Sequence, residues 1–317
     1  MIDVKQVSRY FGRVAAVNDI SFQVAKGEIL GFLGPNAAGK TTTMRILTTF
    51  IPATSGTATV AGFDVHEQSM QVRKRIGYLP ENPPLYPEMR VRDYLDFVAK
   101  IKGVDAKRIK KAVDDAMGKT AITNVGNRVI KHLSKGYKQR VGLAQAIVHN
   151  PDVLILDEPT VGLDPKQIIE VRELIKSLAG EHTIILSTHI LPEVSMTCER
   201  VVIIDKGKVV AEDTPENLTK NLMGAQQLTV SVSGPDKEMA DTLSKIQGVD
   251  TVQIKSQGKG QAFSTLVVES KSRDELRPVI AKTIVEKGWS LYEMKLEDMS
   301  LEDVFLHLTT KEEGSVQ

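Results

Sequence analysis

The stretch GPNAAGKTTT occupies Gly34–Thr43, and it decides how the first part of the chain is expected to fold. It fits the pattern G-x-x-x-x-G-K-[ST], with Gly34, Gly39, Lys40 and Thr41 at the fixed places. The apolar run EILGFLG leads into it, and TTTMRILTTFI follows with helical spacing. Backbone N–H groups at the start of such a helix bind phosphate. The stretch therefore predicts a phosphate-binding loop between a strand and a helix.

The motif gives two side chains of this loop a chemical role. Lys40 is expected to reach the β- and γ-phosphates of ATP, and the hydroxyl of Thr41 is expected to face Mg²⁺. A chance glycine-rich turn is the alternative, and the position between strand and helix disfavours it. The predicted ATP-binding residues of the loop are Gly34, Pro35, Asn36, Ala37, Ala38, Gly39, Lys40, Thr41 and Thr42. ATP and Mg²⁺ are thus the expected cofactors.

A second motif, VLILDEPT, is an apolar strand that ends in two carboxylates. Asp157 at the strand end is predicted to hold Mg²⁺ through water, as in other phosphate-loop enzymes. Glu158 is predicted to polarise the attacking water. Acidic residues also end strands as solvated caps, but four apolar residues followed by paired acids favour the catalytic interpretation.

Composition bounds the class of protein. The chain has 317 residues, enough for two domains, and a net charge of +1, which does not indicate a nucleic-acid partner. The single cysteine, Cys198, excludes a disulfide framework within the chain. We find no leader pattern at the N-terminus, and no apolar run approaches the roughly 20 residues of a membrane-spanning helix. The chain is therefore expected to be cytoplasmic.

Alternating strands and helices predict an α/β first domain over residues 1–222, with a mixed, largely parallel sheet. A helical insertion is expected at about residues 81–135, because ENPPLYP leads into two helical patterns there. Residues 226–310 follow the order β-α-β-β-α-β of a small α+β, ferredoxin-like domain. One of its helices is predicted over residues 272–288, and SLEDVFLHLTT is predicted as a closing helix. Residues 311–317 form the expected tail.

Residues 2 to about 220 resemble the ATP-binding subunit of an ABC transporter, because every motif of that family occurs in order. The most specific is LSKGYKQR, which is similar to the family signature LSGGQ: Ser134 and Gly136 keep their places, while Lys135 and Tyr137 depart from it. Ser134 is expected to cap a helix whose N-terminus, in the family, touches the γ-phosphate held by the opposite subunit. The resemblance implies a head-to-tail homodimer, or a pair with a second ATP-binding subunit, around two ATP molecules.

The resemblance also implies three further site residues. GLDP is similar to the loop that crosses the pair interface through Asp164. His189, in LSTH, lies where the family places a histidine that contacts the γ-phosphate. It follows Glu158 by one helix and one strand, which returns it to the same sheet edge. Phe11 is implied to stack on adenine, with Tyr10 as the fallback.

Two positions depart from the family pattern. Glu81 stands where glutamine is usual, and glutamate can still ligate Mg²⁺. The stretches YLPE and LSKGY together are similar to the exporter-type branch of the family, which includes drug-efflux and gliding-motility-type subunits.

Ala37 stands where the family loop has glycine. If position 37 has a positive φ, alanine costs roughly 1–2 kcal/mol, and if φ is negative the cost is near zero. The larger cost corresponds to ATP binding weakened by about ten- to thirtyfold.

The function implied by the resemblance is an ATPase subunit that powers export through separate membrane permease subunits, on the inner face of the cell membrane. The family docks its permease on the helical insertion, where Pro83, Leu85, Tyr86 and Pro87 form a stiff apolar stretch. One alternative is an importer subunit whose C-terminal domain senses a ligand, which YLPE and LSKGY disfavour. The other is a soluble ABC ATPase outside transport, which the lack of a long coiled coil or a second ATPase unit disfavours. The transported substrate is not encoded in this chain.

Overall fold

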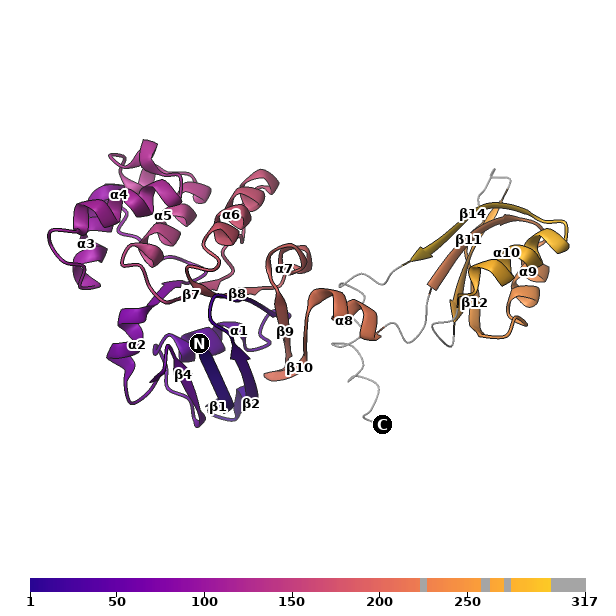
Figure 1. The fold of residues 1–317 in the computed structure, drawn as a ribbon, viewed down its shortest axis with the longest axis horizontal. Helices are drawn as coiled ribbons and strands as arrows, with labels where there is room; N and C mark the ends of the chain where they lie inside the picture. Colours follow the sequence, from indigo (N-terminus) through magenta and orange to yellow (C-terminus); the bar gives the residue numbers. More distant parts are fainter. Residues whose placement is uncertain (223–226, 258–262, 271–274, 298–317) are drawn as a thin grey trace. The chain divides into compact units, whose positions relative to one another are not determined.

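The structure is a computed structural model, and it describes residues 1–222, 227–257, 263–270 and 275–297 (Figure 1). Contacts divide the chain into two compact units, Met1–Pro215 and Glu216–Gln317. In the described part of the chain, no helix is both long enough and apolar enough to cross a membrane.

The centre of the first unit is a mixed six-stranded sheet. Its strands, in spatial order, are β10 (Lys208–Asp213), β9 (Arg200–Asp205), β3 (Ile29–Leu33), β8 (Thr183–Thr188), β7 (Val153–Asp157) and β6 (Ile76–Leu79). All neighbours pair in parallel except β10, which is antiparallel to β9. Every residue of β3, β7 and β8 is buried, as apolar strands covered on both faces must be. The predicted mixed, largely parallel sheet is confirmed.

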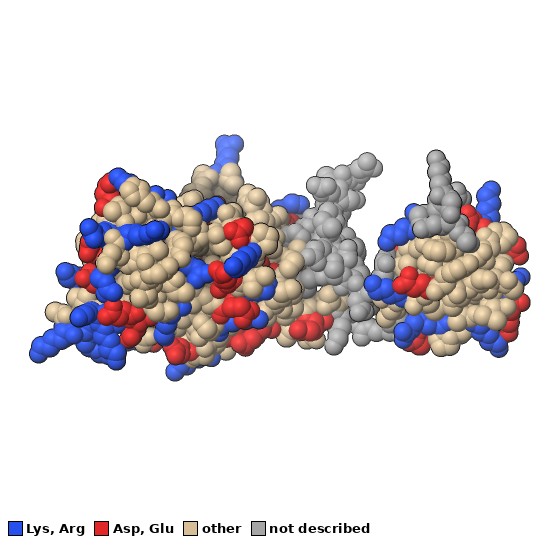
Figure 2. All heavy atoms as spheres, turned by 90° about the horizontal axis from the view of Figure 1, so that it is seen from above, with Lys and Arg blue, Asp and Glu red and all other residues tan. Residues whose placement is uncertain are grey.

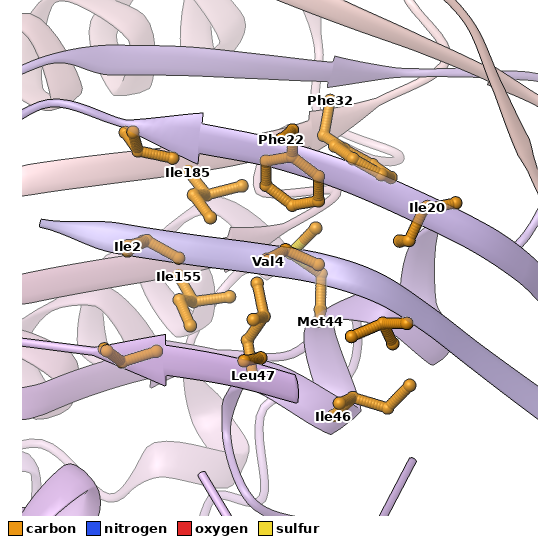
Figure 3. Close-up of a cluster of buried hydrophobic side chains, with 14 of the residues drawn as sticks. Ile2, Val4, Ile20, Phe22, Phe32, Met44, Ile46, Leu47, Ile155 and Ile185 are labelled. Carbon is orange, nitrogen blue, oxygen red and sulfur yellow. The ribbon is translucent and has the colours of Figure 1, made fainter. Parts of the chain in front are cut away.

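A second sheet, which we did not predict as a separate layer, is antiparallel. It consists of β2 (Val14–Val24), β1 (Ile2–Phe11), β4 (Ser55–Val60) and β5 (Phe63–Asp64). Its buried face packs in one core with the six-stranded sheet and helix α1 (Lys40–Leu47), as Val4, Phe22, Met44 and Ile155 illustrate (Figure 3). This core fixes α1, and therefore the loop that precedes it.

The remaining helices of the first unit include the predicted insertion. They are α2 (Ser69–Arg75), α3 (Val91–Ile101), α4 (Ile109–Lys119), α5 (Lys135–Ile147), α6 (Pro165–Ser177) and α7 (Leu191–Thr197). Helix α8 (Pro215–Leu222) begins at the boundary between the units and belongs to the second one apart from its first residue. Two 3₁₀ turns, Thr123–Val125 and Ile130–His132, join α4 to α5. In Figure 1, α3, α4 and α5 lie together at the upper left, above β7.

Side chains from these helices cover the free edge of β6. The ammonium of Lys102 and the Nε2 of His149 bind the Ile76 carbonyl at 3.1 and 3.0 Å, and Gln145 donates to the Tyr78 carbonyl at 2.7 Å. Burial lowers the pKa of His149 to about 4, so its ring is neutral and Nε2–H is the donor. The edge strand that leads to Glu81 is therefore covered by side chains from the helical insertion and from the end of α5 rather than open to solvent.

The second unit contains β11 (Gln227–Ser233), α9 (Asp236–Leu243), β12 (Val249–Gln257), β13 (Ser264–Ser270), α10 (Arg277–Glu286) and β14 (Ser290–Glu297). These follow the predicted order, and the antiparallel sheet β12-β13-β11-β14 has the ferredoxin-like arrangement. The helix predicted from residue 272 was placed too early: α10 begins at Arg277, because Pro278 fits only the first turn of a helix. The predicted closing helix lies outside the described residues.

Candidate nucleotide-binding and catalytic site

A cleft of about 760 Å³ lies where loops follow the C-terminal ends of the strands of the six-stranded sheet, next to the β1–β2 hairpin. Ligands in α/β sheets bind at this edge. The predicted site residues that line it are Phe11, Asn36, Ala37, Gly39, Lys40, Thr41, Thr42, Glu81, Glu158 and His189. Gly34, Pro35, Ala38 and Asp157 do not line the cleft themselves, although Gly34, Pro35 and Ala38 belong to the loop that does.

The loop after β3 holds the ammonium of Lys40 in a buried position. Its Nζ donates to the carbonyls of Gly34 and Pro35, at 2.7 and 3.2 Å, and lies 3.5 Å from Oε1 of Glu158. Gly39 caps the helix with φ 110°, and a Cβ there would lie 2.5 Å from the Ala16 carbonyl oxygen, so only glycine fits. The result is a cation and a helix N-terminus side by side, which together attract phosphate.

Ala37 has a positive backbone angle, which the sequence alone leaves open: its φ is 65°. Its side chain is exposed, so no packing offsets the strain of a left-handed alanine. Its backbone N–H is retained, and an alanine therefore keeps the anion-binding property of the loop. Of the two alternatives for Ala37, a positive or a negative φ, the fold thus adopts the one with the higher backbone strain.

Replacing Ala37 with glycine is expected to tighten ATP binding about threefold. The strain of roughly 1–2 kcal/mol disappears, and the larger entropy loss of glycine, roughly 0.5–1 kcal/mol, removes part of the gain. Titration of the Ala37→Gly variant and of the wild type with fluorescent ATP measures this change in affinity. Ala38→Gly is the matched control, because Ala38 is buried without a positive φ and should gain no affinity. Equal gains in both variants would contradict the strain argument.

The carboxylate of Asp157 is buried at the end of β7. Oδ1 accepts a 2.6 Å hydrogen bond from the hydroxyl of Ser187, its neighbour in register on β8. Oδ2 is buried and has no hydrogen-bond partner among the described residues. Burial raises the pKa of Asp157, and the hydroxyls of Ser187 and Thr41 oppose that rise. An unpaired carboxylate oxygen beside the Thr41 hydroxyl fits a hard, oxygen-seeking cation such as Mg²⁺.

Asp157→Asn is expected to be more stable than the wild type at pH 8 in the presence of EDTA. Because burial raises the pKa of Asp157 in the folded state, its charged form lowers stability at high pH, and this cost fades as pH falls through that pKa. Urea unfolding should therefore show a stability difference between the two proteins that narrows as the pH falls through the raised pKa of Asp157. Mg-ATP should stabilise the wild type more than the Asn variant. A less stable Asn variant at pH 8 would contradict this prediction.

Glu158 and His189 meet at the cleft from separate loops. Nδ1 of His189 lies 3.0 and 2.9 Å from the two carboxylate oxygens of Glu158. Glu158 is buried and has φ 51°, a strained angle that costs of order 1–3 kcal/mol and that functional sites often store. Its carboxylate is thus held between the Lys40 ammonium and an imidazole. A carboxylate in such a place can orient a water molecule and accept its proton.

Of the two aromatic candidates for adenine, Phe11 lines the cleft and Tyr10 does not. The ring of Phe11 is about half exposed and has the guanidinium of Arg9 over it at 4.7 Å from the centroid. The hydroxyl of Tyr10 donates to Asn18 at 3.4 Å.

Ser134, Gly136 and Asp164 do not line this cleft. Ser134 caps α5, accepting from the Tyr137 N–H at 3.4 Å, and Asp164 caps α6 in the same way. Ser134 and Gly136 instead line a second cleft of about 620 Å³. One chain therefore carries the phosphate loop and the signature in two different clefts.

The sequence analysis gave no role to Ser187, although it is the serine of the LSTH motif. They also missed Thr160, Thr188 and Glu193, which lie buried around the loops that carry Glu158 and His189. A signal for Ser187 existed in principle, because a hydroxyl on a strand parallel to β7 can face its carboxylate. The register of the two strands, which the sequence does not state, decides whether it does.

Comparisons with known proteins agree with this geometry. A model of the ABC transporter family matches residues 17–161. An uncharacterised ABC transporter ATP-binding protein, YhcH of Bacillus subtilis, is 33% identical and covers 99% of this chain and 98% of its own. The Nod factor export ATP-binding protein I of Burkholderia orbicola is 32% identical, over 98% and 97%. A solved ATP-binding subunit of an ABC transporter superposes with a TM-score of 0.64 at 27% identity, covering 70% of this chain and 93% of its own. The chain therefore belongs to the ABC transporter ATP-binding proteins, and it is an ATPase that uses ATP with Mg²⁺.

Proposed function

We propose that the chain is the motor subunit of an exporter and that it works as a head-to-tail pair with two ATP molecules between the subunits. The observation that carries this proposal is the separation of Lys40 and Glu158 from Ser134, which line two different clefts. A second copy, or another ATP-binding subunit, would supply the Ser134 side of each ATP site. ATP binding would close the pair, and hydrolysis would reopen it.

Within each site, the loop N–H groups and Lys40 hold the β- and γ-phosphates. Thr41, Asp157 and Glu81 are the residues that would hold Mg²⁺, which neutralises phosphate charge when it is bound. Support for the metal role comes from the unpaired buried oxygen of Asp157. Glu81 is exposed at the mouth of the cleft.

The chemical step depends on Glu158, which orients the attacking water and takes its proton. His189 holds the carboxylate of Glu158 through Nδ1 and directs its other ring nitrogen to the γ-phosphate. Phe11 stacks on adenine. Ser134, Gly136 and Asp164 act on the ATP of the opposite subunit, where the α5 N-terminus adds its dipole to the phosphate charge.

Export, rather than import, is supported by YLPE and LSKGY and by the relative named for Nod factor export. The chain would then lie on the inner face of the cell membrane, held by separate permease subunits.

We also propose that residues 1–222 are the ATPase domain and that 226–310 form an accessory domain, followed by the tail 311–317. The accessory domain would keep two ATPase subunits near each other between strokes. On the face drawn in Figure 2, acidic and basic side chains are interspersed over both units.

The permease would dock on an exposed aromatic cluster of the helical insertion. Tyr86 is 53% exposed, and its ring centroid lies 5.5 Å from that of Phe97 and 6.0 Å from that of Tyr94. Ile101, at the end of α3, is also exposed. An apolar cluster of this kind, rigidified by ring contacts, suits a helix that presents apolar side chains.

Purification of the tagged chain from membranes of its own cells tests this function. We expect a polytopic membrane protein to co-purify with the wild type and to be lost from the double variant Tyr86→Glu, Phe97→Glu. Met70→Glu is the matched control, because Met70 is an exposed apolar residue on α2, outside the cluster. A wild-type chain that brings down only water-soluble proteins would contradict the transport proposal.

A further inference from the structure

One buried carboxylate near the site has no part in the function proposed above. Glu193 lies on α7 and is 4% exposed. Its Oε2 accepts a 2.9 Å hydrogen bond from the hydroxyl of Thr188. That hydroxyl in turn accepts from the N–H of Ile190 at 3.0 Å. These two bonds flank His189, so Glu193 fixes the backbone on which the histidine stands.

The same carboxylate faces the loop that carries Glu158. Thr160, two residues after Glu158, is buried, and its hydroxyl and that of Thr188 oppose the rise in the pKa of Glu193 that burial causes. Oε1 of Glu193 and Oγ1 of Thr160 are both buried without a hydrogen-bond partner among the described residues. A small movement of the loop would let the Thr160 hydroxyl donate to Oε1. Glu193 is therefore placed to join the two loops.

Glu193 differs from the other buried glutamate that lies outside the cleft. Glu28, just before β3, accepts from the Ala25 N–H and pairs with the guanidinium of Arg200 at 2.8 Å. Glu193 has no ion-pair partner among the residues that the structure describes. A buried carboxylate without a cation costs free energy, because no positive charge offsets its desolvation. Such a cost is typical of functional sites rather than of structural cores.

We propose that Glu193 is a positioning residue for ATP hydrolysis, which links the loop after β7 to the loop after β8 and so keeps Glu158 and His189 in contact. The inference rests on the proposed roles of these two residues. Their contact of about 3 Å requires both loops to keep one relative position. The strained φ of Glu158 also persists only where neighbouring groups hold it. Glu193 supplies that restraint through its hydrogen bond to Thr188 and its burial beside Thr160, and it does not line the cleft.

Steady-state ATPase kinetics of the full chain tests this role. Glu193→Ala is expected to lower kcat at least tenfold and to change KM for ATP less than about threefold, because the phosphate loop is untouched. Glu193→Gln should keep kcat within about threefold of the wild type, since its amide oxygen still accepts from Thr188. The matched control is Glu28→Gln, another buried carboxylate, which should lower the melting temperature without lowering kcat. A merely structural Glu193 would behave as Glu28 does, and that result would overturn the proposal.

A second variant covers the case in which Glu193→Ala does not fold. Thr188→Val removes the same link without creating a cavity, and it should lower kcat as much as Glu193→Ala does. In the double variant Thr188→Val, Glu193→Ala, kcat should be no lower than in either single variant, because both substitutions remove the same link. Wild-type kcat in Thr188→Val would overturn the inference. Glu158→Gln in the same assay distinguishes a failure of the proposed function from a failure of the role proposed for Glu193. If Glu158→Gln is inactive and the Glu193 and Thr188 variants are as active as the wild type, the proposed function stands and the role of Glu193 does not.

Discussion

Glu158→Gln is expected to lower the kcat of ATP hydrolysis at least a hundredfold while ATP still binds. Loss of a positioned general base typically costs about 10²–10⁴ in rate. The amide keeps the size of the carboxylate, and it removes a negative charge that faces Lys40 at 3.5 Å. Binding of the γ-phosphate should therefore not weaken. The variant should accumulate ATP-bound protein instead of turning it over.

Light scattering with and without Mg-ATP measures the consequence for assembly. If the accessory domains associate only weakly, the Glu158→Gln chain should be a monomer at light-scattering concentrations without nucleotide and a dimer with Mg-ATP, because unhydrolysed ATP holds the two subunits together. Glu67→Gln is a suitable control, since Glu67 is exposed and lines neither of the two clefts. A dimer already present without ATP would assign the pairing to the accessory domain. Normal kcat in Glu158→Gln would refute its role as the base.

Lys40→Ala is expected to weaken ATP binding at least a hundredfold. The variant loses a buried cation that would otherwise pair with phosphate, and it leaves Glu158 beside the loop with its negative charge uncompensated. Two effects thus act in the same direction, because the orphaned carboxylate also repels the γ-phosphate. Fluorescent-ATP titration gives the affinity, and urea unfolding gives the stability.

The double variant Lys40→Ala, Glu158→Gln separates these two effects. Removing the carboxylate should restore most of the stability that Lys40→Ala loses, because no unpaired buried charge remains. It should not restore wild-type ATP affinity, because the cation is still missing. ATP affinity equal to that of the wild type in either variant would show that Lys40 does not bind phosphate, and the motor function would lose its chemical basis.

The candidate site was predictable to the extent that it is local. The phosphate loop, the paired carboxylates and the helix caps depend on residues within a few positions of each other, and the structure places Lys40, Thr41, Glu158 and His189 around one cleft. Ser134 and Asp164 cap their helices for the same local reason. The partners of these residues are not local. Ser187 reaches Asp157 only through the register of two parallel strands, and His189 meets Glu158, 31 residues earlier, only because β7 and β8 are neighbours in the sheet.

Ala37 shows the same division at a single residue. The sequence established that an alanine stands in the loop, and it limited the consequence to two cases. The tertiary structure selected the strained one, because the path of the loop between β3 and α1 requires a φ of 65° there. By itself the sequence determined the alternation of strands and helices and the candidates for the reacting groups, since periodicity and short motifs act over a few residues. Only the tertiary structure decided which groups meet, because register, layer packing and backbone angles depend on contacts between segments far apart in the chain.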